Sequence, residues 1–469
     1  MATKTYKYRI YPNKEQAEKM ARFFGCARKV YNLCLSWWKE AYTKWKADGT
    51  PMGKMPDYAY YKGLEEFSYL CECDSVALQQ ARMHFQDAIS TFLKSKKAQR
   101  KGKRVGFPKF KKKGVSKDAY TTYNNGNAVK LSADGKHIRL PKLGDVKIVL
   151  HRTFTGTIKS VNVSRSKAGT YHVSLTVETF EPEKPLISKI QHAADPKVVG
   201  LDMSMKHFIV SSDLSDVTKP KYAGLYRKNE RKLARLQRQV SRKQYVGTGE
   251  YRVNDKGKQV EIKKPSKNRE KAQKRLAKFS ERLANQRREF LIQTALHYVR
   301  QYDVVVIEDL DMQQMSKNLK LGKSVGDLAF GEFRHWLEHE AVKHDCYVHV
   351  VDKWFPSSKL CSGCGHKNEG LKLSDRECTC PECGTHHDRD FNAAVNLMNE
   401  FIERYNTAGT AGIEACGAGA STLREAVARA LSEYPVTGRK QEACDASEAA
   451  ARTEARDFDI APVTGCGRG

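Results

Sequence analysis

The chain has 469 residues, of which 40% are hydrophobic and 29% charged, so we expect an ordinary globular protein of two to four domains. It has 83 lysine and arginine residues against 54 acidic ones, a net charge of +29. No stretch approaches the roughly 18 apolar residues of a membrane helix, and the first residues contain no apolar signal core. These features argue against a membrane-spanning chain, and we expect a cytosolic protein without a membrane partner.

The positive charge belongs to the body of the chain, because the residues from Phe401 onward include 8 basic and 10 acidic side chains. It is spread over separate segments such as KKAQRKGKR, KFKKK and RKNERKLARLQRQVSRK. One such run alone is typical of a solvated helix face. The total favours a polyanionic partner, and its distribution over many elements favours nucleic acid over an anionic membrane.

The first 190 residues predict a helical segment inserted into a β-rich one. TKTYKYRIYP alternates like a strand, and Asn13 then precedes a long stretch with helical periodicity. A second helical stretch begins at Ser75, and from Gly106 the pattern becomes β with glycine turns. We predict a small β-barrel, which the first strand joins across the helical insertion.

The second half alternates strands and helices, which predicts an α/β domain. Its first strand ends at Asp202, and two basic helices follow at about 225–243 and 269–300, with apolar stripes that should pack on one another. Residues 244–265 between them predict a hairpin with an exposed tip. DVVVIEDL, GEFRHWLEHEAVKHDC, YVHVVDKWFP and DFNAAVNLMNEFIERY complete the series, and we expect the Ala-, Gly- and Glu-rich tail to be mostly disordered.

Cysteine spacing gives the strongest local signal. Two Cys-x2-Cys pairs are separated by 15 residues: Cys361, Cys364, Cys380 and Cys383. Two such knuckles supply the four thiolates of a closed tetrahedral zinc site, which is structural rather than catalytic. A redox pair or an iron–sulfur site is the alternative. Cys378, His386 and His387 are rival ligands that would break the paired geometry.

Three acidic residues suggest a second metal site. Asp202 and Glu308 end predicted strands and Asp390 begins a predicted helix; each alone is typical of a surface or capping residue. An RNase H-like fold brings acids from such positions together, and phosphodiester hydrolysis by two divalent ions needs that cluster. Asp309 should face away from Glu308, because neighbours on a strand face opposite sides. One of Asp388 and Asp390 should cap the helix.

These segments together resemble the TnpB family of transposon-encoded RNA-guided nucleases and the related compact type V CRISPR effectors. The resemblance covers roughly the first 415 residues. The motifs that carry it are YRIYPNKEQ, FGCARKVYN, SVALQQA, GFPKFKKK, VVGLDMSMKHFIVSSD, VVVIEDLDM, VDKWFPSSKLCSGCGHKN and CPECGTHHDRDFNAAVNL. The segment 244–265, which many relatives keep short, and the tail after Ser421 depart from the family pattern.

The resemblance implies a multidomain α+β protein in the prokaryotic cytosol. Its domains would be a wedge-like β-barrel (1–15 and 105–190), a helical recognition domain (16–104), a RuvC domain of RNase H-like fold (191–355 and 385–406), a zinc ribbon (356–384) and a tail (407–469). It also implies that Asp202, Glu308 and Asp390 hold two Mg²⁺ ions. The partners would be a guide RNA and a target DNA that carries a short adjacent motif.

The function implied is RNA-guided DNA cleavage by metal-assisted hydrolysis, leaving 5′-phosphate and 3′-hydroxyl ends. Two alternatives remain: an RNA-guided regulator that binds DNA without cutting, and a transposase or transposition accessory protein with the same fold. The presence of all three acids argues against the regulator. The N-terminal segments fit RNA binding better than strand transfer. Whether the guide derives from a transposon end or a CRISPR array is left open.

Overall fold

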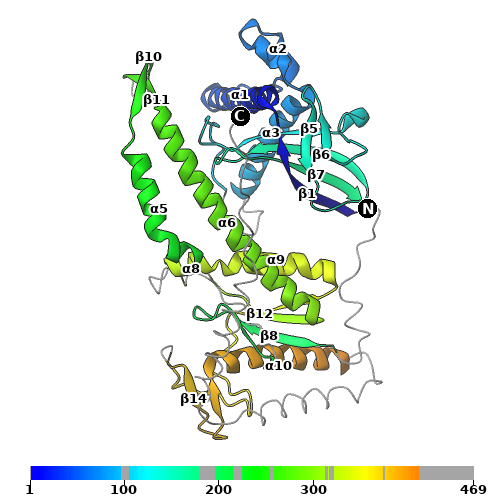
Figure 1. Cartoon of the computed structure of the whole chain (residues 1–469), viewed down its shortest axis with the longest axis vertical. Coiled ribbons are helices and arrows are strands. Elements are labelled where there is room, and N and C mark those ends of the chain that lie inside the picture. The colour runs from blue at the N-terminus through cyan, green and yellow to red at the C-terminus, as the bar shows by residue number, and fades with distance from the viewer. Residues whose placement is uncertain are drawn as a thin grey trace, which may run out of the picture. The chain divides into compact units, whose positions relative to one another are not determined.

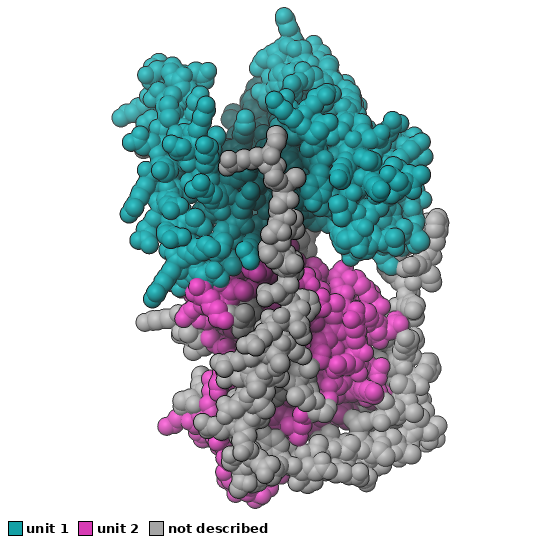
Figure 2. Space-filling model, in the orientation of Figure 1, with its two compact units in different colours: residues 1–184, 229–285 teal, residues 185–228, 286–469 magenta. Residues whose placement is uncertain are grey.

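The computed structural model describes residues 2–96, 105–179, 196–214, 224–253, 258–311, 315, 322–372 and 375–410. The chain divides into two compact units, coloured separately in Figure 2: residues 1–184 with 229–285, and residues 185–228 with 286–469. Residues 229–285 therefore group with the N-terminal unit, whereas the sequence had placed them in the nuclease domain. The predicted tail lies outside the described residues from 411 onward.

A curled seven-stranded antiparallel sheet forms the centre of the first unit (Figure 1). Its strands are β1 (Ala2–Tyr11), β2 (Asp118–Tyr123), β3 (Lys130–Leu131), β4 (His137–Leu140), β5 (Gly144–Val149), β6 (Thr157–Arg165) and β7 (Tyr171–Thr179), in the order β2-β6-β7-β1-β5-β4-β3. β1 pairs with both β5 and β7, which confirms that the first strand joins the sheet across the helical insertion.

The predicted barrel is not closed. Among the described residues no pairing joins β2 to β3, the strands at the two edges of the sheet. β3 has only two residues, too few for the ladder that closure requires. The sheet is therefore a half-barrel with two edges.

The helical insertion packs on this sheet. It contains α1 (Lys14–Asp48), α2 (Tyr58–Gly63), η1 (Glu65–Glu72) and α3 (Ser75–Lys96). Asn13 and Gln16 form a capping box at the start of α1, and Gly49 ends it in the left-handed conformation with a φ of 73°. One apolar cluster joins Phe24 and Phe85 of the helices to Tyr120 of β2, so sheet and insertion share a core.

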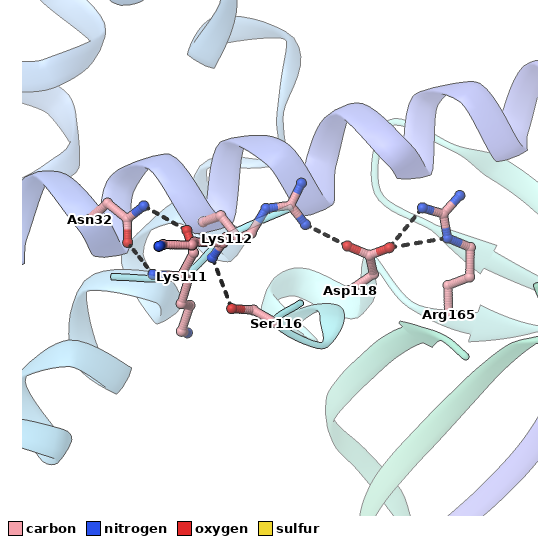
Figure 3. Close-up of polar contacts among 7 residues, drawn as sticks. Asn32, Lys111, Lys112, Ser116, Asp118 and Arg165 are labelled. Carbon is pink, nitrogen blue, oxygen red and sulfur yellow. Dashed lines mark hydrogen bonds and ion pairs between the residues drawn. The ribbon is translucent and has the colours of Figure 1, made fainter. Parts of the chain in front are cut away.

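Polar contacts fix the loop before β2 against α1 (Figure 3). The Asn32 amide donates to the carbonyl of Lys111 at 2.9 Å and accepts from its backbone N–H at 2.8 Å. Asp118 accepts from Arg28 at 2.5 Å and from Arg165 at 2.7 Å, joining α1 to β2 and β6. The basic run around Lys111 is thus fixed to α1 through its backbone.

The second unit contains a four-stranded sheet in the order β13-β12-β8-β9. β8 (Val198–Asp202), β12 (Val304–Glu308) and β13 (Tyr347–Val351) are parallel, and β9 (Val210–Ser211) is antiparallel to β8. Helices cover both faces (Figure 1). The C-terminal part of α6 (Lys267–Gln301) and α9 (Phe330–His344) pack on one face, and α10 (Arg389–Thr410) packs on the other. The short α8 (Gly322–Leu328) precedes α9.

Two basic helices and a β-hairpin form an arm (Figure 1). α5 (Leu225–Ser241) leads into β10 (Tyr245–Val253), which pairs with β11 (Gln259–Pro265) before α6 begins. Lys232 of α5 lies 4.5 Å above the ring of Phe279 in α6, and Arg269 of α6 donates to the Val240 carbonyl of α5. The predicted hairpin and the predicted packing of the two helices are both confirmed.

A small two-stranded sheet lies between β13 and α10 in the sequence. Its strands are β14 (Glu377–Thr379) and β15 (His386–Asp388), and β15 runs directly into α10. In the part of the chain that the structure describes, no helix is both long and apolar enough to cross a membrane.

Candidate functional site

Asp202 and Glu308 are the last residues of two neighbouring parallel strands. Leu201 of β8 lies opposite Ile307 of β12, so the two acids follow at the same edge of the sheet. Most of the residues that precede them in the two strands have buried aliphatic side chains. A shift of the pairing by one residue would expose these side chains, so their burial fixes the register of β8 against β12. The carboxyl edge of a parallel sheet is where α/β proteins place functional groups.

Asp390 reaches this edge through α10. The helix packs directly on β8 at Gly200, where a Cβ atom would overlap the carbonyl of Ala394. Asp390 lies in the first turn of α10, and its carboxylate accepts a 2.9 Å hydrogen bond from Ser204, two residues after Asp202. Arg376 approaches the other carboxylate oxygen at 3.4 Å. The late helix thus brings its acid to the end of the first strand.

The electrostatics show that the three acids interact. Burial first, and then the charges of Asp390 and Glu308, raise the pKa of Asp202 to about 8, while Arg389 and Arg376 oppose the shift. Burial also raises the pKa of Glu308, with Asp309 adding to the effect and a hydrogen bond from Ser357 opposing it. Buried carboxylates that raise one another's pKa are typical of functional sites.

Two neighbouring acids are excluded from this group by their contacts. Asp309 accepts from Arg334 of α9 at 2.5 Å, so its carboxylate is engaged by that helix. The carboxylate of Asp388 accepts from the backbone N–H groups of Asp390 and Phe391 at 3.1 and 3.2 Å. Asp388 is therefore the cap of α10, which leaves Asp390 free of that role.

The four cysteines form a tight cluster. Among the described residues, they are the group whose ligand atoms all lie within 4.8 Å of one another; the three carboxylates are less closely gathered. Each Cys-x2-Cys turn is closed by a glycine N–H that donates to the first cysteine carbonyl, Gly365 to Cys361 at 2.8 Å and Gly384 to Cys380 at 3.0 Å. Both glycines have positive φ, which the turn requires.

The rival ligands stand outside the cluster. Of these, His387 lies nearest, with its Nε2 atom 3.1 Å from the sulfur of Cys361. His386 contacts Glu377 and Thr379, and Cys378 pairs with His387 across the two strands. A hydrogen bond from Thr385 lowers the pKa of Cys383 to about 6, which favours the thiolate that binds metal.

Two asparagines that the sequence did not single out join the cysteine cluster to α10. Asn392 donates to the carbonyl of Leu360 at 2.6 Å and accepts from the N–H of Ser362 at 2.9 Å. Asn396, one turn later, donates to the carbonyls of Ser357 and Leu360 at 2.7 and 2.8 Å. Both are buried. A pair of asparagines four residues apart within an apolar helix was the available signal.

Three family models match the chain. They are described as "Helix-turn-helix domain" over residues 1–46, "Probable transposase" over residues 174–319, and "Cas12f1-like, TNB domain" over residues 330–397. The last match spans the cysteine cluster and the start of α10.

Full-length relatives are also found. A protein of Streptomyces pristinaespiralis named as an RNA-guided DNA endonuclease is 33% identical over 90% of this chain and 93% of its own length. InsQ of Escherichia coli K12, named likewise, is 29% identical over 84% of this chain and 91% of its own. A TnpB-like protein of Acanthamoeba polyphaga mimivirus is 28% identical over 32% of this chain and 30% of its own. The chain belongs to the TnpB family.

Among solved structures, a Cas12f1 complex with guide RNA and target DNA aligns with a TM-score of 0.45 and 14% identity, covering 85% of this chain and 99% of that one. The compact endonuclease Cas_phi3 aligns with a TM-score of 0.43 and 10% identity, over 85% and 92% of the two chains.

Proposed function

We propose that this protein is an RNA-guided DNA endonuclease that cuts its target in a RuvC domain of RNase H-like fold. The observation that carries the proposal is the meeting of Asp202, Glu308 and Asp390, from two strands and a helix far apart in the sequence, at one sheet edge. Its full-length relatives are named for the same activity. A guide RNA would supply the sequence choice and duplex DNA the substrate.

The donor set fits magnesium. Three carboxylates and no sulfur or imidazole donor are what a hard, oxygen-preferring divalent ion requires. When bound, a pair of such ions supplies water activation and stabilisation of the leaving oxygen. The chain's own part is to hold the donors: Ser204 and Arg376 fix the two oxygens of Asp390, and Ser357 bonds to Glu308.

The cysteine cluster supports a zinc ribbon with a structural role. Four thiolates complete a tetrahedral coordination shell, which leaves no open position for a substrate. Asn392 and Asn396 connect this module to α10, the helix that carries Asp390. The ribbon would therefore stabilise the position of one catalytic carboxylate.

The regulator hypothesis and the nuclease hypothesis predict different results for neutral replacements. Asp202→Asn, Glu308→Gln and Asp390→Asn should each abolish cleavage of a matched DNA, because each removes charge that would hold a cation beside the scissile phosphate. Binding of the same DNA should persist, since guide pairing and backbone contacts supply it.

Asp309→Asn is the matched control, one residue from Glu308 and turned toward Arg334. The assay uses protein purified with its own RNA, a labelled DNA duplex and Mg²⁺, with binding measured by gel shift. Persistent cutting by all three variants would refute the nuclease assignment. Loss of binding together with cutting would show that these acids act in folding instead.

A further inference from the structure

The β10–β11 ribbon exposes apolar and aromatic side chains on both of its faces. Tyr251 is 64% exposed and Tyr245 is 51% exposed. Val246, Val260 and Ile262 are exposed as well. These exposed fractions leave the two-stranded ribbon with little apolar burial to stabilise it, so side chains of this kind indicate a surface that binds something.

The pairing register separates the two faces. Tyr245 lies opposite Pro265 and Tyr251 opposite Glu261, and positions 261 and 265 of β11 point to the same side. Both tyrosines therefore share a face with Glu261 and with Lys263, which lies opposite Gly247, a residue without a side chain. The three valine and isoleucine residues and Lys264 occupy the other face. Four residues along β11 place the two tyrosines roughly 14 Å apart.

The base of the ribbon is rigidly mounted. Arg269 donates to the carbonyls of Val240 and Lys243 at 2.7 and 2.6 Å, which closes the end of α5, and its guanidinium lies 4.2 Å from the ring of Tyr245. The backbone N–H of Ser266 donates to the carbonyl of Gln244 at 3.3 Å, joining the two strands where they meet the helices. This end of the ribbon is therefore preorganised.

Specific contacts also fix the irregular part of β10, where the pairing register shifts. Thr248 donates to the carbonyl of Ile262 at 2.6 Å across a break in the register. Gly249 has a φ of 74°, and the Glu261 carboxylate occupies the space above Gly247. A bulge of this kind sets the direction of the side chain that follows it, here Tyr251.

The surroundings are strongly basic. From Lys258 to Arg275 the chain contains eight lysine and arginine residues and two glutamates. Between Leu225 and Lys243 there are eight basic residues and one acidic. Exposed aromatic rings beside dense positive charge match a polynucleotide with accessible bases, because each base stacks on a ring while lysine and arginine neutralise its phosphates.

We propose that the tyrosine face of the β10–β11 ribbon binds unpaired nucleotides of the guide RNA, with bases stacked on Tyr245 and Tyr251. The inference rests on the proposed function for the existence of a guide. Unpaired RNA is favoured over duplex DNA because tyrosine rings need an open base face, and RNA loops present such bases continuously.

The test compares the two faces of one ribbon. Tyr251→Ser removes an exposed ring from the tyrosine face, and Val260→Thr alters an exposed residue of the other face. Each protein is purified from cells that also transcribe the DNA flanking its gene, so that a guide RNA encoded there can bind. The RNA that copurifies with the wild type is extracted and bound again to RNA-free wild-type and variant protein. Acylation of the 2′-hydroxyl groups then shows which nucleotides each protein protects. We expect Tyr251→Ser to weaken binding about tenfold and to expose a short run of nucleotides that the wild type protects. Val260→Thr should match the wild type.

Three results would overturn the proposal. One is unchanged protection of every nucleotide in the Tyr251→Ser variant, with equal melting temperatures showing that both proteins are folded. Another is normal RNA protection with weakened binding of a 12-nucleotide single-stranded DNA, which would assign the face to DNA. The third is a loss of RNA binding in Val260→Thr as large as in Tyr251→Ser, which would indicate that both changes act on folding. A wild-type protein that carries no RNA contradicts the proposed function as well, so that failure is distinguishable from failure of the ribbon alone.

Discussion

The carbonyl oxygen of Ala394 in α10 lies where a Cβ atom on Gly200 of β8 would have to be. A Cβ atom on Gly200 would also lie only 2.9 Å from the backbone nitrogen of Met398. The helix that carries Asp390 thus rests backbone to backbone on the strand that ends at Asp202. The distance between these two acids depends on the absence of a single side chain.

Gly200→Ala should therefore be costly for both stability and cleavage. The added methyl group must push α10 away, because the atoms it meets are backbone and cannot rotate aside. We expect a loss of about 3 kcal/mol in the free energy of unfolding of the second unit, and a severe loss of cutting. Urea unfolding and a DNA cleavage assay measure the two effects.

The matched control is Gly331→Ala in α9, where nothing lies within 4 Å of the added Cβ. This change should leave stability equal or raise it slightly, since alanine favours helix. If Gly200→Ala has the same stability and cleavage activity as Gly331→Ala, the close packing of α10 on β8 is not required for either property.

Much of the architecture follows from local pattern. Two short apolar runs in the sequence each end in an acidic residue. Because buried parallel strands have this apolar composition, the sequence predicted correctly that Asp202 and Glu308 lie at strand ends. The cysteine pairs also define their own cluster through spacing alone. The hairpin at 244–265 was visible as two β-rich runs around a turn.

Other features depend on contacts between distant residues. Whether the N-terminal sheet closes depends on its edge strands, and no local pattern shows that β3 is only two residues long. The spacing of Asn392 and Asn396 within an apolar helix suggests a shared role, but it does not reveal their carbonyl partners, which are 32 to 39 residues away. The Ser204 contact to Asp390 spans 186 residues and is equally invisible in the sequence.

Zinc binding should distinguish the four clustered cysteines from their neighbour. Cys361→Ser should remove most of the bound zinc, about one ion per chain, and lower the melting temperature, since a closed site loses one of its four thiolates. Mass spectrometry of the native protein and metal analysis give the stoichiometry.

Cys378→Ser is the control for that change, because Cys378 lies on the adjacent strand outside the cluster. It should retain full zinc content. Retention by Cys361→Ser and loss by Cys378→Ser would show that the ligands are wrongly assigned.

Asp388→Ala tests the division of roles between the two aspartates around Arg389. Asp388 accepts from two backbone N–H groups at the start of α10, and removing it should cost about 1 kcal/mol of stability. Cleavage should be reduced but measurable, whereas Asp390→Asn should show none. An inactive Asp388→Ala protein beside an active Asp390→Asn protein would reverse the assignment.

Stability in acid should depend on His172 in β7. This residue lies opposite Arg9 of β1, and its pKa is lowered to about 4, first by burial and then by the charges of Lys7, Arg9 and Lys117, with Glu281 opposing them. Below the ordinary pKa of about 6.5, the unfolded chain takes up a proton that the folded protein does not. Stability is therefore unaffected at neutral pH and falls as the pH drops toward 4.

At pH 5 this difference amounts to about 1 kcal/mol once solvent screening of the half-buried ring is allowed for. His172→Gln should remove that part of the acid-induced loss, so that the variant loses less stability than the wild type between pH 7.5 and pH 5. Lys7→Gln should reduce the loss partly, because it removes one of the charges that oppose protonation. Urea unfolding at both pH values, at the same low ionic strength and after removal of nucleic acid, measures the effect. Identical losses in all three proteins would show that His172 is protonated equally easily in the folded and unfolded states.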